Sequence, residues 1–121
     1  MTAARFVILH HRERTGEHWD LMIEQDDGLA TWRLARMPSA DDAAPIAATQ
    51  LGLHRKAYLD YEGPVSGDRG EVTRVDAGAC EILEQNERCW RVRLMGRTLA
   101  YTYALRRHDT VDPNGWTLMS A

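Results

Sequence analysis

The sequence predicts a mainly β domain, an antiparallel barrel or sandwich of about eight short strands with one or two short helical segments. Several stretches alternate apolar and polar residues, as strands with one buried face do. Turn sequences rich in glycine, aspartate and asparagine separate these stretches, and helical spacing of apolar residues is scarce. We expect a small closed barrel, because closure removes exposed strand edges.

The expected strands follow one another with tight connections. In the clearest strand, His18 to Glu24, the residues Trp19, Leu21 and Ile23 fall on one face, and Asp26-Asp27-Gly28 supplies a hairpin turn. The other expected turns are Ala77-Gly78, Gly96-Arg97 and Asp112-Pro113-Asn114-Gly115. The remaining expected strands are Arg5 to Leu9, Leu29 to Leu34, Glu71 to Asp76, Ala79 to Leu83, Cys89 to Met95, Thr98 to Leu105 and Trp116 to Met119.

The best candidate for helix is a turn or two around His54 to Tyr61. The most loop-like stretch, Met37 to Pro45, contains two prolines and an acidic pair, and we interpret it as a linker within one domain. Its alanine-rich continuation could carry a short helix, although Pro45 interrupts the pattern. We therefore treat residues 1–121 as a single domain.

The composition is that of an ordinary globular domain, with 44% hydrophobic and 27% charged residues. It argues against a disordered tail, a collagen-like chain and a coiled coil. The longest strictly apolar run near the start, Phe6 to Leu9, is too short for a secretory or membrane-spanning segment, so we expect a cytoplasmic protein without a membrane partner. Cys80 and Cys89 form no metal motif, and we expect packed, reduced thiols, with a cross-strand pair as the alternative.

The charge balance limits the kinds of nucleic-acid site that the chain can offer. Fifteen basic and eighteen acidic residues give a formal charge of −3. A protein that binds nucleic acid by charge alone is normally basic, so any phosphate site here must be a local patch in an acidic surround. The sequence contains no P-loop, no dinucleotide-binding glycine fingerprint and no nucleophile elbow.

His18 and Asp20 form the first candidate site. They lie two residues apart on an alternating strand, so both side chains point away from the apolar face, with Cα atoms about 6.5–7 Å apart. An imidazole and a carboxylate at this spacing suit a divalent metal such as Mn²⁺ or Zn²⁺. A third ligand could come from His10 or His11, if the first strand lies beside the second. The alternative is a solvated polar face with an incidental contact.

His54 and Tyr58 form the second candidate site. Four residues apart, they would share one face of a helix and could supply an acid or hydrogen-bond donors to a phosphate. The alternative is a surface histidine beside a packed tyrosine. Basic residues flank both histidine segments, and arginine forks bind phosphate oxygens well, although each could simply be a surface charge. These residues are Arg12, Arg14, Arg36, Arg55 and Lys56.

Four segments in this order resemble the 3′-phosphoesterase domain of bacterial DNA ligase D and its stand-alone relatives. The resemblance covers most of the chain from Phe6 to about Asp76, with a weaker echo at Trp116-Thr117-Leu118. The segments are Phe6-Val7-Ile8-Leu9-His10-His11, Glu17-His18-Trp19-Asp20-Leu21-Met22-Ile23-Glu24, Gly28 to Ser39 and Leu53 to Gly63.

The resemblance implies a small β-barrel with a polar groove on its outer surface. It implies Mn²⁺ held by His11, His18 and Asp20, with Zn²⁺ or Co²⁺ as alternatives. His54 and Tyr58 match the residues that contact the reacting phosphate, and Arg36 matches a family lysine, so Arg36, with Arg55 or Arg14, is expected to bind phosphate oxygens. The implied reaction trims 3′ ends by removing a terminal ribonucleoside and then a 3′-phosphate.

The sequence departs from the family pattern at several positions, and two of these departures concern the candidate site directly. The family arginine two residues after the aspartate is Met22 here, which weakens the expected grip on phosphate. The loop between the metal histidines has one extra residue, so His10 competes with His11, although the ungapped match from Phe6 favours His11.

We therefore expect a metal-dependent phosphoesterase acting on the 3′ ends of nucleic acid, such as DNA or a DNA–RNA junction, in a repair-like role. A repair ligase or polymerase is the expected protein partner. The first alternative is a catalytically weak or inactive module that binds a nucleic-acid end or a protein on the same fold, which the charge of −3 and Met22 favour. The second alternative is a phosphoesterase for small molecules.

Overall fold

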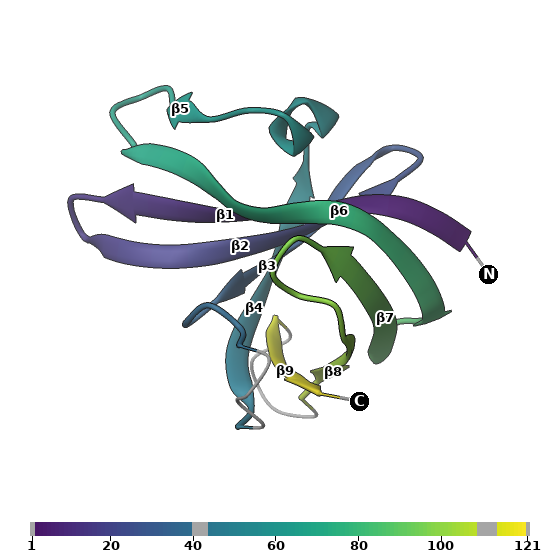
Figure 1. Ribbon diagram of the computed structural model, residues 1–121. Coiled ribbons are helices and arrows are strands. Elements are labelled where there is room, and N and C mark those ends of the chain that lie inside the picture. The colour runs from purple at the N-terminus through teal and green to yellow at the C-terminus, as the bar shows by residue number, and fades with distance from the viewer. Residues whose placement is uncertain (1, 40–43, 109–113, 121) are drawn as a thin grey trace.

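The computed structural model describes residues 2–39, 44–108 and 114–120. In these ranges the chain forms nine strands and one short 3₁₀ helix (Figure 1). The elements are β1 (Thr2–Glu13), β2 (Gly16–Gln25), β3 (Gly28–Leu34), β4 (Ile46–His54), η1 (Lys56–Leu59), β5 (Gly63–Pro64), β6 (Glu71–Gln85), β7 (Cys89–Gly96), β8 (Thr102–Arg107) and β9 (Gly115–Ser120).

All pairings between these strands are antiparallel, and the sheet closes on itself. The strand order is β1-β2-β3-β4-β9-β8-β7-β6, and pairing of β6 with β1 completes an eight-stranded barrel within the described part of the chain. The two-residue β5 pairs with the start of β6, outside the barrel proper. The predicted small antiparallel β-barrel is therefore confirmed.

The barrel interior contains the larger hydrophobic cluster. Trp32 lies in it with ring centroids 4.9 Å from Trp90 and 5.6 Å from Trp116, both in edge-to-face geometry. Leu21 and Ile23 also point inward and are fully buried, as the alternation of the second strand predicts. Cys80 is buried in the same interior, and both cysteines are free thiols, as expected.

A second, smaller hydrophobic cluster lies on the outside of the barrel wall. The segment that contains η1 and β5 lies over β1 and β6, at the top of the view in Figure 1. Leu59 of η1 belongs to this cluster, and Tyr58 and Val65 pack against it. The other members are Val7, Leu9, Met22, Leu29 and Val72. The covering segment therefore makes a buried zone on a face that alternation alone would leave to solvent.

The turn expected at Ala77-Gly78 is wrong, because β6 runs through it without reversing. A Cβ on Gly78 would lie 2.2 Å from the Met95 carbonyl oxygen, so glycine allows β7 to approach closely. The strand is interrupted instead by a β-bulge, since Ile8 pairs with Asp76 but Leu9 pairs with Arg74. Glycine here serves strand packing and not a turn.

The region between β3 and β6 also differs from expectation. Residues 40–43 of the expected linker lie outside the described residues, but the alanine-rich stretch after Pro45 is strand β4 and not a helix. The helix expected from His54 to Tyr61 is reduced to η1, and His54 itself ends β4. Alanine has weak strand preference, and the pairing of β4 with β3 and β9 overrides it.

The reversal after β7 is longer than the expected Gly96-Arg97 turn, and β8 begins at Thr102 instead of Thr98. The buried carboxylate of Asp76 accepts hydrogen bonds from the backbone N–H groups of Arg97, Thr98 and Leu99 at 2.8–3.2 Å. These bonds hold the connection in place without a strand. Most of the expected turn at 112–115 lies outside the described residues, and no helix within the described ranges could span a membrane.

Candidate metal and phosphate site

The register of three neighbouring strands brings the candidate ligands together. His11 on β1 lies directly opposite His18 on β2, and Asp20 on β2 lies opposite Arg33 on β3. Directly opposed residues in an antiparallel pair share a face, and residues two apart on one strand do too. These four side chains therefore share the outer face of the barrel wall.

His11, His18 and Asp20 converge on one centre. Their ligand atoms all lie within 4.8 Å of one another. The Asp20 Oδ2 atom is 3.4 Å from His18 Nε2 and 3.9 Å from His11 Nδ1. The two imidazole rings meet edge to face, with centroids 4.7 Å apart. This arrangement presents two nitrogens and a carboxylate oxygen to the same small volume.

The orientation of His11 is set by its second ring nitrogen. His11 Nε2 lies 2.6 Å from the carbonyl oxygen of Arg69, which can only accept, so Nε2 donates this bond and Nδ1 is the ring nitrogen directed toward Asp20. Gly70 allows this contact: it has a positive φ of 79°, and a Cβ there would lie 1.9 Å from the Arg12 carbonyl oxygen. The glycine-rich stretch thus positions a metal-binding candidate.

His18 and Asp20 are buried, with 9% and 4% of their surface exposed. Burial lowers the pKa of His18, although the neighbouring Asp20 carboxylate acts in the opposite direction. Burial also raises the pKa of Asp20, against the influence of His18 and Arg33. The His18 Nε2 and Asp20 Oδ1 atoms are buried without a hydrogen-bond partner among the described residues. Such atoms are costly unless another group satisfies them.

The donor set fits a divalent metal ion. Two imidazole nitrogens and one carboxylate suit ions of intermediate hardness such as Mn²⁺ or Zn²⁺. A cation would also satisfy the orphaned nitrogen of His18 and oxygen of Asp20. The carbonyl of Arg69 supplies the outer hydrogen bond that metal-binding histidines usually make.

His10 is directed away from this centre, although it is adjacent in sequence to His11. Its ring stacks on Trp19 with centroids 4.7 Å apart, and its Nε2 atom lies 3.0 Å from Glu17 Oε2. His10 lies opposite Trp19 in the strand pairing and so shares the other face of β1. The geometry therefore favours His11 over His10 as a member of the cluster.

A cavity of about 190 Å³ opens beside the cluster, and we name it the site cavity. His54, at the end of β4, and Tyr58, in η1, line it with ring centroids 6.0 Å apart. His54 Nδ1 donates to the Gly52 carbonyl oxygen at 2.9 Å, which leaves Nε2 to hold or give up a proton. The other lining residues are Leu9, His11, Glu13, Asp20, Met22, Arg33, Leu51, Val65, Arg69 and Val72.

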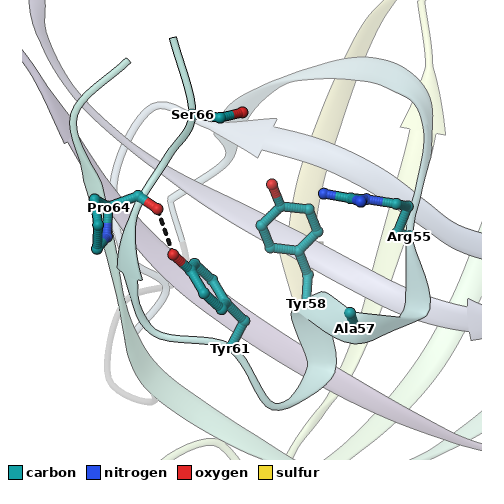
Figure 2. A pocket seen from close by; sticks show the side chains of 6 residues that line it. All are labelled: Arg55, Ala57, Tyr58, Tyr61, Pro64 and Ser66. Carbon is teal, nitrogen blue, oxygen red and sulfur yellow. Dashed lines mark hydrogen bonds between the residues drawn. The ribbon is translucent and has the colours of Figure 1, made fainter. Parts of the chain in front are cut away.

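The three arginines expected at the phosphate lie apart from one another. Arg14 pairs with Asp68 at 3.4 Å on the exposed surface, and Arg36 donates to the Ala44 carbonyl oxygen at 3.0 Å. Neither lines the site cavity. Arg55 lines a neighbouring pocket, together with Tyr58 (Figure 2). None of these three arginines is therefore part of the lining of the site cavity.

Arg33 is the residue that the sequence reasoning missed. It lines the site cavity, and its Nε atom lies 4.0 Å from Asp20 Oδ1, too far for a hydrogen bond. The signal was present, because a two-residue turn after Gln25 pairs Asp20 with Arg33 in the expected hairpin. Met22, on the same face, is buried and apolar.

A comparison with models of known protein families identifies the family of this chain. The family whose sequence model matches is the DNA ligase D 3′-phosphoesterase domain, over residues 9–107. This range includes both histidines of the cluster, Asp20, His54 and Tyr58. No curated protein matches the sequence. Because the match spans most of the 121 residues, the chain belongs to the DNA ligase D 3′-phosphoesterase domain family.

Proposed function

We propose that this protein is a metal-dependent phosphoesterase that acts on the 3′ ends of nucleic acid. The observation that carries the proposal is the convergence of His11, His18 and Asp20, with two orphaned buried atoms, beside a cavity lined by His54 and Tyr58. Family membership supports the phosphoester chemistry. DNA and DNA–RNA junctions are the proposed substrates, and a repair ligase or polymerase partner stays a prediction.

His11, His18 and Asp20 would hold the metal ion, for which we favour Mn²⁺ over Zn²⁺ or Co²⁺. When bound, the ion supplies Lewis-acid polarisation of a phosphoryl oxygen. The protein's own contribution to the metal site is a rigid donor set: the Arg69 carbonyl fixes the His11 ring, and burial fixes the other two side chains.

His54 and Tyr58 would act on the phosphoryl group itself. With its Nδ1 proton donated to Gly52, His54 presents Nε2 to the cavity as a donor or proton source for a phosphoryl oxygen. The Tyr58 hydroxyl would orient the same group. His54 ends the barrel strand β4 and Tyr58 lies in η1, and both line the site cavity beside the metal cluster.

Arg33 would bind the remaining phosphate oxygens. It would take the role of the family arginine at whose position this chain has Met22. Its side chain is 46% exposed and its guanidinium makes no hydrogen bond to the described residues, so its donors are available to a ligand. The two positions lie on neighbouring strands, since Met22 pairs with Thr31 and Asp20 pairs with Arg33. The Arg33 guanidinium would thus reach the site cavity from β3, whereas an arginine at position 22 would reach it from β2.

The test measures phosphate release from an oligonucleotide with a 3′-phosphate in the presence of Mn²⁺. We expect His18→Ala and Asp20→Ala to abolish turnover, and Arg33→Ala to lower kcat/KM by about 10²–10³-fold, the usual loss for one transition-state donor. We expect His11→Ala to abolish turnover as well. His10→Ala is the matched control for His11→Ala, and Arg36→Ala is the matched control for Arg33→Ala; both controls should retain activity. Turnover that survives both His18→Ala and Asp20→Ala would contradict the proposal.

The second candidate is a non-catalytic module that binds a nucleic-acid end on the same barrel. The apolar Met22 in the site cavity and the net charge of −3 favour it. Such a module would bind the oligonucleotide without releasing phosphate, and the His54→Ala substitution would therefore cause no loss of phosphate release.

A further inference from the structure

A second hollow of about 190 Å³ lies beside the site cavity, and we name it the tyrosine pocket. Its lining residues, drawn in Figure 2, are Arg55, Ala57, Tyr58, Tyr61, Pro64 and Ser66. They come from η1 and from the segment that continues through β5, so the pocket lies in the covering segment and not in the barrel wall.

Two aromatic rings form a corner in this pocket. Tyr58 and Tyr61 have centroids 5.8 Å apart and ring planes at 89°. The Tyr61 hydroxyl donates a hydrogen bond to the Pro64 carbonyl oxygen, which fixes that ring against the turn into β5. A planar ligand stacked on one ring would therefore present its edge to the other, which is a favourable aromatic arrangement.

The polar groups at the rim also suit a heteroaromatic ring. The Arg55 guanidinium lies 5.9 Å from the Tyr58 ring centroid, within cation–π range. Ser66 Oγ accepts a bond from Arg69 at 3.2 Å, so its own hydroxyl hydrogen remains available to donate. In Figure 2 the Tyr58 hydroxyl points toward Ser66, with Arg55 on one side and Tyr61 on the other.

The tyrosine pocket adjoins the site cavity. Tyr58 lines both, and the adjacent residues Val65 and Ser66 line one each. A group bound in the tyrosine pocket is therefore separated from the proposed phosphate position by one side chain. The base and the 3′-phosphate of one nucleotide are likewise neighbours, joined through its sugar.

We propose that the tyrosine pocket binds the nucleobase of the nucleotide whose 3′-phosphate occupies the site cavity. This inference rests on the proposed function. A cavity of about 150 Å³ accommodates a benzene ring, so a hollow of this size takes one aromatic ring. Every base has a stacking face, so binding here would tolerate all four bases. The pocket would position the 3′ end without sequence specificity.

The first experiment compares two oligonucleotides that both carry a 3′-phosphate, one with a normal terminal thymidine and one with an abasic terminal sugar. With Mn²⁺ and the full chain, we expect kcat/KM to be about 5- to 150-fold lower for the abasic end, the range of one base–aromatic stack. The loss should appear mainly in KM, because stacking is made in both ground and transition states.

The second experiment uses Tyr61, which lies outside the lining of the site cavity. Tyr61→Ala should lower kcat/KM on the normal end more than on the abasic end. Tyr61→Phe, which keeps the ring and loses the bond to Pro64, should lower kcat/KM on the normal end less than Tyr61→Ala does.

The outcomes separate the two proposals. Equal kcat/KM on both ends by the wild-type protein would overturn the base pocket and leave the phosphoesterase proposal standing. If neither oligonucleotide is turned over, the phosphoesterase proposal is overturned, and the base-pocket proposal with it. Because the wild-type comparison needs no variant, a Tyr61→Ala protein that fails to fold does not affect it.

Discussion

The two faces of the same barrel wall are built on opposite principles. On β1, Phe6 and Ile8 point into the interior cluster, whereas Val7 and Leu9 point outward into the smaller cluster under the covering segment. All four are buried. The side chains that pack together in the barrel interior are almost all apolar. The outer face continues from its apolar cluster into the titratable pair His18 and Asp20, whose Nε2 and Oδ1 atoms have no hydrogen-bond partner among the described residues. The unpartnered buried atoms of the interior are instead the indole nitrogens of Trp32 and Trp116. Stability and chemistry thus occupy opposite sides of single strands.

Trp32→Ala tests the interior half of this comparison and carries the largest expected effect. Removing a fully buried tryptophan that contacts Trp90 and Trp116 should lower the free energy of unfolding by about 3–5 kcal/mol. Urea denaturation measures this loss. The folded variant should keep the metal affinity of the wild type, measured by calorimetry with Mn²⁺. A large change in metal affinity would show that the two faces are not separable.

Asp20→Asn tests the outer face of the barrel wall, with a smaller expected effect on stability than Trp32→Ala. The sign of its effect relative to wild type should differ without and with Mn²⁺. Without metal, the variant should melt no lower than wild type, because a buried carboxylate oxygen without a partner is replaced by a neutral amide. With Mn²⁺ at 100 times its Kd, wild type should gain about 2.7 kcal/mol and the variant should not. Thermal melts with and without Mn²⁺ measure both quantities.

The control for this prediction is Asp26→Asn, which changes a carboxylate in the exposed turn between β2 and β3. This variant should keep the full metal-linked rise in melting temperature. A variant Asp20→Asn that also keeps the rise would contradict the assignment of Asp20 as a ligand.

The inner face was more predictable from the sequence than the outer face. Alternation in His18 to Glu24 predicted that Leu21 and Ile23 would be buried and that His18 and Asp20 would share the opposite side. Alternation could not predict that this opposite side is buried too, because the cover comes from residues about forty positions later. A strand pattern reports which side chains share a face, and not what lies on that face.

The same limit explains the contacts that were missed. The Arg69 carbonyl orients His11 through a backbone atom, and any residue type could supply that atom. By contrast, Arg33 was accessible to reasoning from the hairpin register, because its position opposite Asp20 follows from the turn. Arg14 was preferred for its closeness to the histidines in the sequence and Arg36 for its match to a family lysine, and neither lines the site cavity.

The two cysteines give the comparison with the smallest expected effect. One thiol lies inside the barrel and the other lies at its edge. Cys80 is fully buried, and burial raises the pKa of its thiol to about 12, from an ordinary value of 9.0. The folded state therefore holds a proton that the unfolded chain releases, so stability conferred by this thiol is present below about pH 9 and is lost as pH rises toward 12. The slope for one proton is at most about 1.4 kcal/mol per pH unit.

Cys80→Ala should therefore lose stability less steeply than wild type between pH 9 and pH 10, in urea melts at each pH. Cys89 lies at the start of β7 with 9% exposure, and burial raises the pKa of its thiol as well. A thiol reagent should label Cys89 through local opening, at a rate that denaturant barely changes at low concentration, and Cys80 only through global unfolding. Equal labelling of both thiols under native conditions would show that the barrel interior opens as easily as its rim.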